Sequence, residues 1–424
     1  MKEDTRHIHY AYVILVSVMI QRLVVSAENS VIGLFILPVT EALHVSQGQF
    51  MLYTTIQYLM LAASSVAVRK LMGKVRYVVL NRVGLLFMTG GILCMAAAKS
   101  IWMFYIGGAL NGIGLCVTIF LLTGTLIPRW FSGNTGLMIA TASLGSTISA
   151  TAAYPIVSRL LMRETVLGLE AWRGTYVILA LLPGSIGLVN SVLLMRESPE
   201  SMGLEKLERA GRDKATEQRW EHLSVSGDTA LKSRSYKTLV TAVILWNVSI
   251  TACSYMAAYT STTEAYATAA FDLRGLLGVA STIGTFIGGY ILGGLNDRLG
   301  AGKGLILAGI CGAAGYLMFF MGRKAPFMIL AGSFILGIFI SLNNVQLPAM
   351  VETMYGTKDY DRIFPAASSA SSWIGAITSS VWGFINDFTG GYTVLLISAA
   401  AIAAMSLLTG LAAVREAGTL ERSI

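Results

Sequence analysis

Long apolar stretches, separated by short polar breaks, follow one another from end to end of the chain. A helix that crosses a bilayer needs about 20 mostly apolar residues. A window of this length predicts twelve such spans, so we expect an all-α membrane protein. The predicted spans are 10–40, 47–68, 77–98, 102–127, 136–158, 174–195, 238–261, 275–296, 304–322, 326–350, 363–386 and 391–414.

One long polar segment, 196–237, divides these spans six and six. We therefore predict an N-terminal six-helix bundle (1–195), a cytoplasmic central loop (196–237) and a C-terminal six-helix bundle (238–424). Glycines recur at matching places in the two halves, for example Gly112 in "GALNGIG" and Gly337 in "FILGIFI", which favours two pseudo-symmetric copies of one unit. Secondary transporters are often built from such repeats, with the substrate site at midplane between them.

Composition and charge support the membrane assignment. The 424 residues are 54% hydrophobic and only 13% charged, about half the charged share of a soluble protein. The net charge of +8 reflects where the basic residues fall. Most of them lie in the segments that share one side of the membrane, which by the positive-inside rule places both termini in the cytoplasm, in the cytoplasmic (inner) membrane. The basic excess is thus a topology signal, and we expect no nucleic-acid partner.

The sequence lacks the motifs that are typical of metal binding, disulfide frameworks and ATP hydrolysis. The four cysteines lie far apart inside apolar stretches and form no CxxC pair, so neither a zinc site nor a disulfide framework is expected. No GxxxxGK[ST] phosphate-binding loop occurs, which argues against an ATP-driven mechanism. We expect a monomeric protein in the lipid bilayer that is not an enzyme and that holds no cofactor and no metal.

The first span carries an unusual group of polar residues. Arg22 and Glu28 would each cost at least roughly 2.5 kcal/mol at the membrane centre unless paired or hydrated. At about 100° per residue, Gln21 and Glu28 point in one direction and Arg22 and Asn29 in another. This wedge favours a water-filled cavity. The alternative is an Arg22–Glu28 pair that only fixes helix packing.

Two roles follow for the charged pair. We predict that Glu28 couples transport to protons, because a buried carboxyl group takes up a proton nearer to neutral pH than an exposed one. We predict that Arg22 binds a substrate anion through a charge-assisted fork of hydrogen bonds.

Further polar side chains lie on the spans expected to line the cavity. Unsatisfied polar groups facing lipid cost about several kcal/mol, so each serves either as a hydrogen bond between helices or as a substrate contact. Besides Arg22 and Asn29, the candidates for substrate binding are Gln57, Asn111, Asn247, Tyr255, Asn343, Asn344 and Trp373.

A set of motifs carries a family resemblance. Gly293-xxx-Asp297-Arg298-x-Gly300 ends the eighth span, and "HYAYVIL", "PRWFSGNTGLMIATASLGS", "AWRGTY", "SPESMGL", "YGTKDYDRIF" and "NDFTGGY" occur elsewhere. Together they resemble the major facilitator superfamily, and within it the branch of monocarboxylate transporters and oxalate/formate antiporters. The resemblance implies two six-helix bundles that work by alternating access.

The signature also implies gating roles. In this family Asp297 would accept hydrogen bonds from the start of the fifth span, near 133–136, and Arg298 belongs to the same motif. We expect Gly289 and Gly293 to let neighbouring helices approach closely, and Gly300 to permit a tight turn.

The first half departs from this pattern. Lys70, three residues before Gly73, takes the place of the signature acid, whereas Asp359 and Asp361 precede the eleventh span. Our hypothesis is a gating contact of reversed polarity, with the base on the second span and the acids before the eleventh.

The chain departs from the branch pattern at the positions where relatives carry cationic side chains that bind the substrate. Where relatives of this branch carry an arginine in the eighth span, this chain has Gly289, and where they carry a lysine in the first span it has Asn29 or Ser30. Either Arg22 has taken over the role, or the substrate is not a simple anion. The Gly-Pro motif of drug exporters is also missing from the fifth span.

We predict a proton-linked secondary transporter of a small organic solute, a carboxylate, with Glu28 and Arg22 at its site. The first alternative is an exporter of neutral or cationic amphiphiles, in which Glu28 binds the cation. The second is a receptor or scaffold that signals through 196–237.

Overall fold

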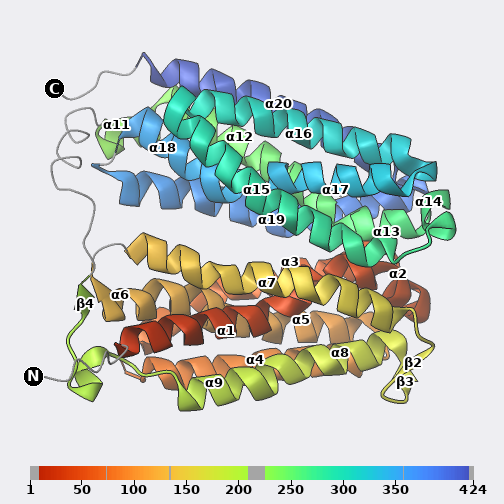
Figure 1. The fold of residues 1–424 in the computed structure, drawn as a ribbon, viewed down its shortest axis with the longest axis horizontal. Helices are drawn as coiled ribbons and strands as arrows, with labels where there is room; N and C mark the ends of the chain where they lie inside the picture. The colour runs from red at the N-terminus through yellow and green to blue at the C-terminus, as the bar shows by residue number, and fades with distance from the viewer. Residues whose placement is uncertain (1–8, 73, 133–134, 209–224, 357, 420–424) are drawn as a thin grey trace, which may run out of the picture. The chain divides into compact units, whose positions relative to one another are not determined.

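The computed structural model of the chain describes residues 9–72, 74–132, 135–208, 225–356 and 358–419 (Figure 1). Among these residues, ten helices are long and apolar enough to cross a membrane. Two more, α7 (Thr135–Leu161) and α19 (Tyr360–Thr389), have 27 and 30 residues but are rich in Ser and Thr, which lowers their hydropathy. The all-α membrane fold with its twelve spans is therefore confirmed.

Contacts divide the chain into two compact units. Spans one, two and five each supply residues to both of them. The units are groups of contacting residues, whereas the predicted boundary at 196–237 separates two sequence repeats. Unit 1 comprises Met1–Val31, Ile56–Ala153 and Leu160–Arg212, and unit 2 comprises Ile32–Thr55, Tyr154–Arg159 and Asp213–Ile424.

In unit 1, α4 (Tyr77–Ala96) packs against α5 (Ile101–Leu115) and α8 (Ala171–Leu181). Its core includes Val24, Leu85, Met88 and Leu115, all buried. The helices and helical stretches contributing to it are α1 (Tyr10–Ser30), α3 (Gln47–Leu71), α4 (Tyr77–Ala96), α5 (Ile101–Leu115), a π-helical stretch (Cys116–Leu126), α6 (Ile127–Trp130), α7, α8 (Ala171–Leu181), a second π-helical stretch (Leu182–Gly187) and α9 (Leu188–Leu193).

The first span breaks where a continuous helix over 10–40 was predicted. α1 ends at Ser30, and α2 (Ile32–Leu43) begins after Val31. The Val31 amide donates to the Glu28 carbonyl at 3.1 Å, a bond over three residues that tightens the last turn. Beyond the break, a Cβ at Gly33 would lie 2.2 Å from the Ser254 carbonyl oxygen, so α2 packs closely within unit 2.

Unit 2 has a core between α12, α16, α19 and α20, with Trp246, Leu305 and Phe339 fully buried. Besides α2 and parts of α3 and α7, its elements are α12 (Arg234–Ala252), a 3₁₀ turn (Cys253–Tyr255), α13 (Met256–Ser261), α14 (Glu264–Thr268), α15 (Leu273–Leu299), α16 (Ala301–Met321), a 3₁₀ turn (Gly322–Lys324), α17 (Pro326–Ile340), a π-helical stretch (Leu342–Gln346), α18 (Leu347–Tyr355), α19 and α20 (Thr393–Ala417).

The close helix contact of α15 lies earlier in the helix than predicted. A Cβ at Gly293 would meet nothing within 4 Å, and one at Gly289 only a Val345 methyl group at 3.8 Å. A Cβ at Gly284, by contrast, would lie 1.9 Å from the Phe334 carbonyl oxygen. A Cβ at Gly288 would lie 2.7 Å from the Ile338 Cα. The predicted close approach at Gly289 and Gly293 is therefore wrong, because α17 packs against the face of α15 that carries Gly284 and Gly288.

The described parts of the connecting segments hold four very short strands that the apolar pattern did not predict. β1 (Phe131–Ser132) pairs in parallel with β4 (Leu207–Glu208), and β2 (Thr165–Val166) pairs antiparallel with β3 (Leu169–Glu170). The described parts of the central segment otherwise form a 3₁₀ turn (Pro199–Met202) and the short helix α11 (Gly227–Lys232).

Candidate functional site

Five of the predicted polar residues lie in unit 1, and four of them form two hydrogen-bonded pairs. Glu28, on the last turn of α1, is 3% exposed, and Asn111 of α5 is fully buried. The Asn111 side-chain nitrogen donates to Glu28 Oε2 at 2.9 Å. A carboxylate that accepts a hydrogen bond inside an apolar bundle is less costly than an isolated one, and this contact joins α1 to α5.

Gln57 of α3 adds a third helix. Its side-chain nitrogen donates to Asn29 Oδ1 at 3.1 Å, so the neighbour of Glu28 on α1 is tied to α3. A Cβ at Gly112 would lie 2.1 Å from the Gln57 carbonyl oxygen. Only glycine permits α5 to approach α3 this closely, and the approach places Asn111 next to Gln57. The residues Glu28, Asn29, Gln57 and Asn111 are called the amide cluster below.

Arg22 reaches a fourth helix. Its Nε donates to Ser146 Oγ of α7 at 3.4 Å, and the Ser146 hydroxyl lies 2.8 Å from the hydroxyl of Ser26. α7 comes close to α1 because Gly145 replaces a side chain there: its Cβ would lie 2.1 Å from the Met19 carbonyl oxygen. Arg22 is partly exposed, and its contact with Ser146 ties the side chain to α7.

The predicted polar wedge is wrong for Gln21. This side chain is fully buried and accepts from the Asn190 side-chain nitrogen at 3.3 Å. Asn190 also donates to the Ser17 carbonyl at 3.0 Å. Gln21 and Glu28 share a face of α1, but two helical turns separate them. Gln21 therefore meets α9, whereas Glu28 meets α5.

The candidates of the second half form a separate set in unit 2. Asn247 and Asn343 exchange two hydrogen bonds, at 3.2 and 3.1 Å, and the Trp246 indole nitrogen donates to Asn343 Oδ1 at 2.8 Å. The buried Tyr255 donates its hydroxyl to the Ser379 carbonyl at 2.6 Å. These side chains bind one another or the backbone.

Asn344 and Trp373 are exposed on unit 2, Trp373 to 50%. The sequence places both on spans expected to line the cavity, and their exposure leaves substrate binding by either one a prediction.

The predicted gating residues lie at helix ends. Lys70 in the last turn of α3 is exposed, as are Asp297 and Arg298 in the last turn of α15. Gly300 has a φ of 85°, in the left-handed region that favours glycine, which confirms the tight turn between α15 and α16. Gly73 and residues 133–134 lie outside the described residues.

The Asp359 carboxylate, which the reversed-polarity hypothesis assigns to Lys70, has a partner within unit 2. It accepts from the Gly227 amide at the start of α11, at 2.6 Å. The reversed gating contact stays a prediction.

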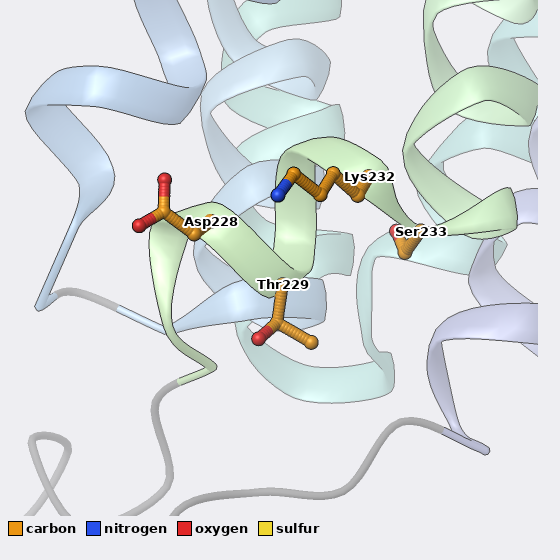
Figure 2. Close-up of a pocket in the computed structure, with 4 residues that line it drawn as sticks. All are labelled: Asp228, Thr229, Lys232 and Ser233. Atoms are coloured by element: carbon orange, nitrogen blue, oxygen red, sulfur yellow. The ribbon is translucent and has the colours of Figure 1, made fainter.

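A hollow of about 410 Å³ lies over α11, lined by Asp228, Thr229, Lys232 and Ser233 (Figure 2). Asp228 forms an ion pair with Arg362 of α19 at 2.8 Å. Because Asp359 of the same helix binds Gly227, these contacts fasten α11 to α19, and we interpret the hollow as the surface of a structural junction.

The apolar pattern did not single out Asp387. Its two carboxylate oxygens accept from the amides of Gln47 and Gly48, at the start of α3, at 3.0 and 2.8 Å. These amides have no partner inside their own helix, and a carboxylate there also interacts favourably with the helix dipole. The Tyr392 hydroxyl donates to Gln47 Oε1 at 3.1 Å.

Glu197 makes a similar contact in unit 1. Its Oε1 accepts from the Tyr77 amide at the start of α4, at 2.8 Å, and from Arg129 at 3.1 Å. The "SPESMGL" motif begins just after this residue. The motif carries the family resemblance, and the glutamate directly before it is the sequence signal for this contact.

Within the described residues, twelve long helices define a multi-pass membrane protein. The sequence model of the Major Facilitator Superfamily matches residues 18–273. The chain belongs to this family, and it is a transporter rather than an enzyme. The family prediction is thus confirmed at the level of the superfamily. A search of curated proteins finds no match.

Solved structures share the fold at low identity. The nucleoside transporter NupG is 11% identical, with a TM-score of 0.70 over 98% of this chain and 100% of its own. A bacterial homolog of the human lysosomal transporter Spinster, inward-facing and unoccupied, is 13% identical, with a TM-score of 0.66 over 97% and 95%. A D-xylose–proton symporter is 12% identical, with a TM-score of 0.66 over 94% and 97%. At these identities the likeness extends to the fold alone.

Proposed function

We propose that the protein is a proton-linked secondary transporter of a small organic carboxylate, working by alternating access in the cytoplasmic membrane with both termini in the cytoplasm. The monocarboxylate transporter and oxalate/formate branch is the part of the superfamily that its motifs resemble. The orientation is supported by the distribution of Lys and Arg along the sequence.

The observation that carries the proposal is the arrangement of the two charged side chains of α1. Glu28 is 3% exposed and hydrogen-bonded to Asn111, whereas Arg22 is partly exposed beside Ser146. A buried carboxyl group is suited to gaining and losing a proton during a transport cycle. A partly exposed arginine is suited to binding a carboxylate, because its planar fork of N–H groups matches the two carboxylate oxygens. The D-xylose–proton symporter shows that this fold supports proton coupling.

The test is uptake by purified protein in proteoliposomes, with and without an imposed pH gradient. We first screen small carboxylates, amino acids and lipophilic cations by thermal shift, because a bound solute stabilises the folded state. With the best acid, wild type should accumulate solute when the outside is acidic. Glu28→Gln keeps the shape and the Asn111 contact but cannot ionise, so its accumulation should no longer respond to the pH gradient, while exchange of labelled for unlabelled solute continues.

Two results would contradict the proposal. Gradient-driven accumulation by Glu28→Gln equal to that of wild type would remove the coupling role of Glu28. Stabilisation by lipophilic cations but by none of the acids would favour the exporter of cationic amphiphiles instead.

A further inference from the structure

Two arginines at one end of unit 1 have no acidic partner. Arg82 lies in the second turn of α4, and Arg196 follows the end of α9. Both side chains are partly buried. Within the part of the chain that the structure describes, neither of them forms an ion pair. Arginine without a counter-charge is costly in a membrane-spanning segment, so two of them at one place need an explanation.

The two guanidinium groups meet at the last turn of α9. Arg82 Nη2 donates to the Ser191 carbonyl at 3.3 Å. Arg196 Nη1 donates to the Val192 carbonyl at 3.4 Å and to the Met195 carbonyl at 3.0 Å. Because Ser191 and Val192 are consecutive, both positive charges gather over neighbouring carbonyl oxygens, which carry only partial negative charge.

Arg82 also has an unused donor. Its Nε is shielded from solvent and has no hydrogen-bond partner, whereas buried polar groups in folded proteins nearly always have one. Arg82 lies about 8 Å from the start of α4 along the helix axis. A long arginine side chain at this depth extends towards the membrane surface. The acceptor that Nε lacks therefore belongs at the level of the lipid headgroups.

The acid that is nearest in sequence, Glu197, is already engaged. Its Oε1 accepts from the Tyr77 amide and from Arg129, and its Oε2 lies 3.9 Å from Arg76 Nε. These contacts commit the carboxylate to the start of α4 and to two other arginines. It therefore does not neutralise Arg82 or Arg196.

Apolar side chains flank the two arginines on both helices. α4 and α9 contact each other (Figure 1). On α4 the exposed apolar residues recur at intervals of four and three, so they form a single face. The exposed apolar residues of the two helices are Val79, Val83 and Leu86 on α4 and Val189, Val192 and Leu193 on α9. In a bilayer such surfaces are covered by acyl chains, so an anion held beside them is one that carries such chains.

We propose that the ends of α4 and α9 bind an anionic phospholipid. Its phosphate accepts from Arg82 Nε and from the remaining N–H groups of Arg196, and its acyl chains lie along the exposed apolar faces. Basic pockets between membrane-spanning helices bind anionic headgroups in this way, and a guanidinium matches a phosphate with two parallel hydrogen bonds. Neither arginine belongs to the amide cluster, and the proposal does not depend on which solute is transported.

The alternative is that the two arginines only cap the carbonyl groups at the end of α9, where positive charge is favourable. The test measures thermal unfolding of the purified full-length protein in detergent while one compound is titrated. The compounds are dioleoyl-phosphatidylglycerol, dioleoyl-phosphatidylcholine and glycerol phosphate. Phosphatidylglycerol should stabilise the protein at a concentration about tenfold or more below that of phosphatidylcholine. Glycerol phosphate, which has the charge without the chains, should have no effect at these concentrations.

Variants test whether the two arginines are responsible. Arg196→Gln should weaken the response to phosphatidylglycerol by about fivefold and leave the response to phosphatidylcholine unchanged, and Arg82→Gln should act in the same direction. Arg173→Gln is the matched control. Arg173 also donates to a backbone carbonyl of α4, that of Ala96 at 3.2 Å, but it is paired with Glu170 at 3.1 Å. It should keep the full preference for phosphatidylglycerol.

Three results would overturn the proposal. Equal responses to the two lipids would exclude a site for the anionic headgroup. Stabilisation by glycerol phosphate equal to that by phosphatidylglycerol would replace the lipid with a soluble anion. If Arg196→Gln and Arg82→Gln lower the melting temperature equally in both lipids and keep the preference, the arginines only cap α9.

Discussion

At Arg22 we expect the type of cationic side chain to decide how a substrate carboxylate is bound. Its Nε donates to Ser146 Oγ at 3.4 Å, and a guanidinium carries five N–H groups in a planar fork that matches a carboxylate. Lysine keeps the charge but lacks the planar fork. The sequence made Arg22 and Glu28 visible because charges are rare inside spans. It could not show their partners, Ser146 and Asn111, because these depend on which helix faces which turn of α1.

We expect Arg22→Lys to weaken binding of the carboxylate that the wild-type protein binds most tightly by about tenfold, because one charged contact replaces two parallel bonds. Calorimetry on the purified variant measures the change. Ser146→Ala is the control, because it removes the serine contact and leaves the guanidinium intact, so it should lose much less affinity. Equal affinities of Arg22→Lys and wild type would exclude the bidentate role.

At the scale of elements, glycines decide how closely helices approach at the site. Gly112 brings α5 onto α3 and Gly145 brings α7 onto α1, and these two contacts assemble the polar residues. The helices themselves were predictable from apolar length, but their details were not. The break at Val31 has no proline or glycine at the break itself. The apolar pattern also cannot predict the π-helical stretches, because a span that is apolar on all faces has the same pattern as an α-helix or as a π-helix.

Gly112→Ala should destabilise the protein by roughly 1–3 kcal/mol, because a methyl group placed 2.1 Å from the Gln57 carbonyl oxygen must push α5 and α3 apart. Thermal unfolding in detergent measures the loss. Gly90→Ala on α4 is the matched control. A Cβ there meets nothing within 4 Å, so melting should stay the same or rise slightly. Equal melting temperatures for both variants would mean that the α3–α5 contact tolerates a side chain.

For the whole molecule, the departure of the first half from the family pattern bears on transport. Lys70 is exposed at the end of α3, in the place where the second half carries Asp297. Under the reversed-polarity hypothesis the positive charge matters more than the exact side chain. Lys70→Asp should therefore reduce the initial rate of uptake in proteoliposomes by about tenfold or more, whereas Lys70→Arg should keep most of it. Similar rates for the two variants would argue against a gating contact at this position.

The sharing of spans one, two and five between the two units has a consequence for how the protein is made. Residues 32–55 and 154–159 belong by contacts to the unit that contains the C-terminal half. The ribosome releases both segments before any residue of α12 exists. Some of their polar groups, such as the amides at the start of α3, are bound by Asp387. These groups therefore lack this partner until the eleventh span has been synthesised. The final spans thus complete helices that were inserted first, and a chain stopped after its sixth span would leave those ends unfinished.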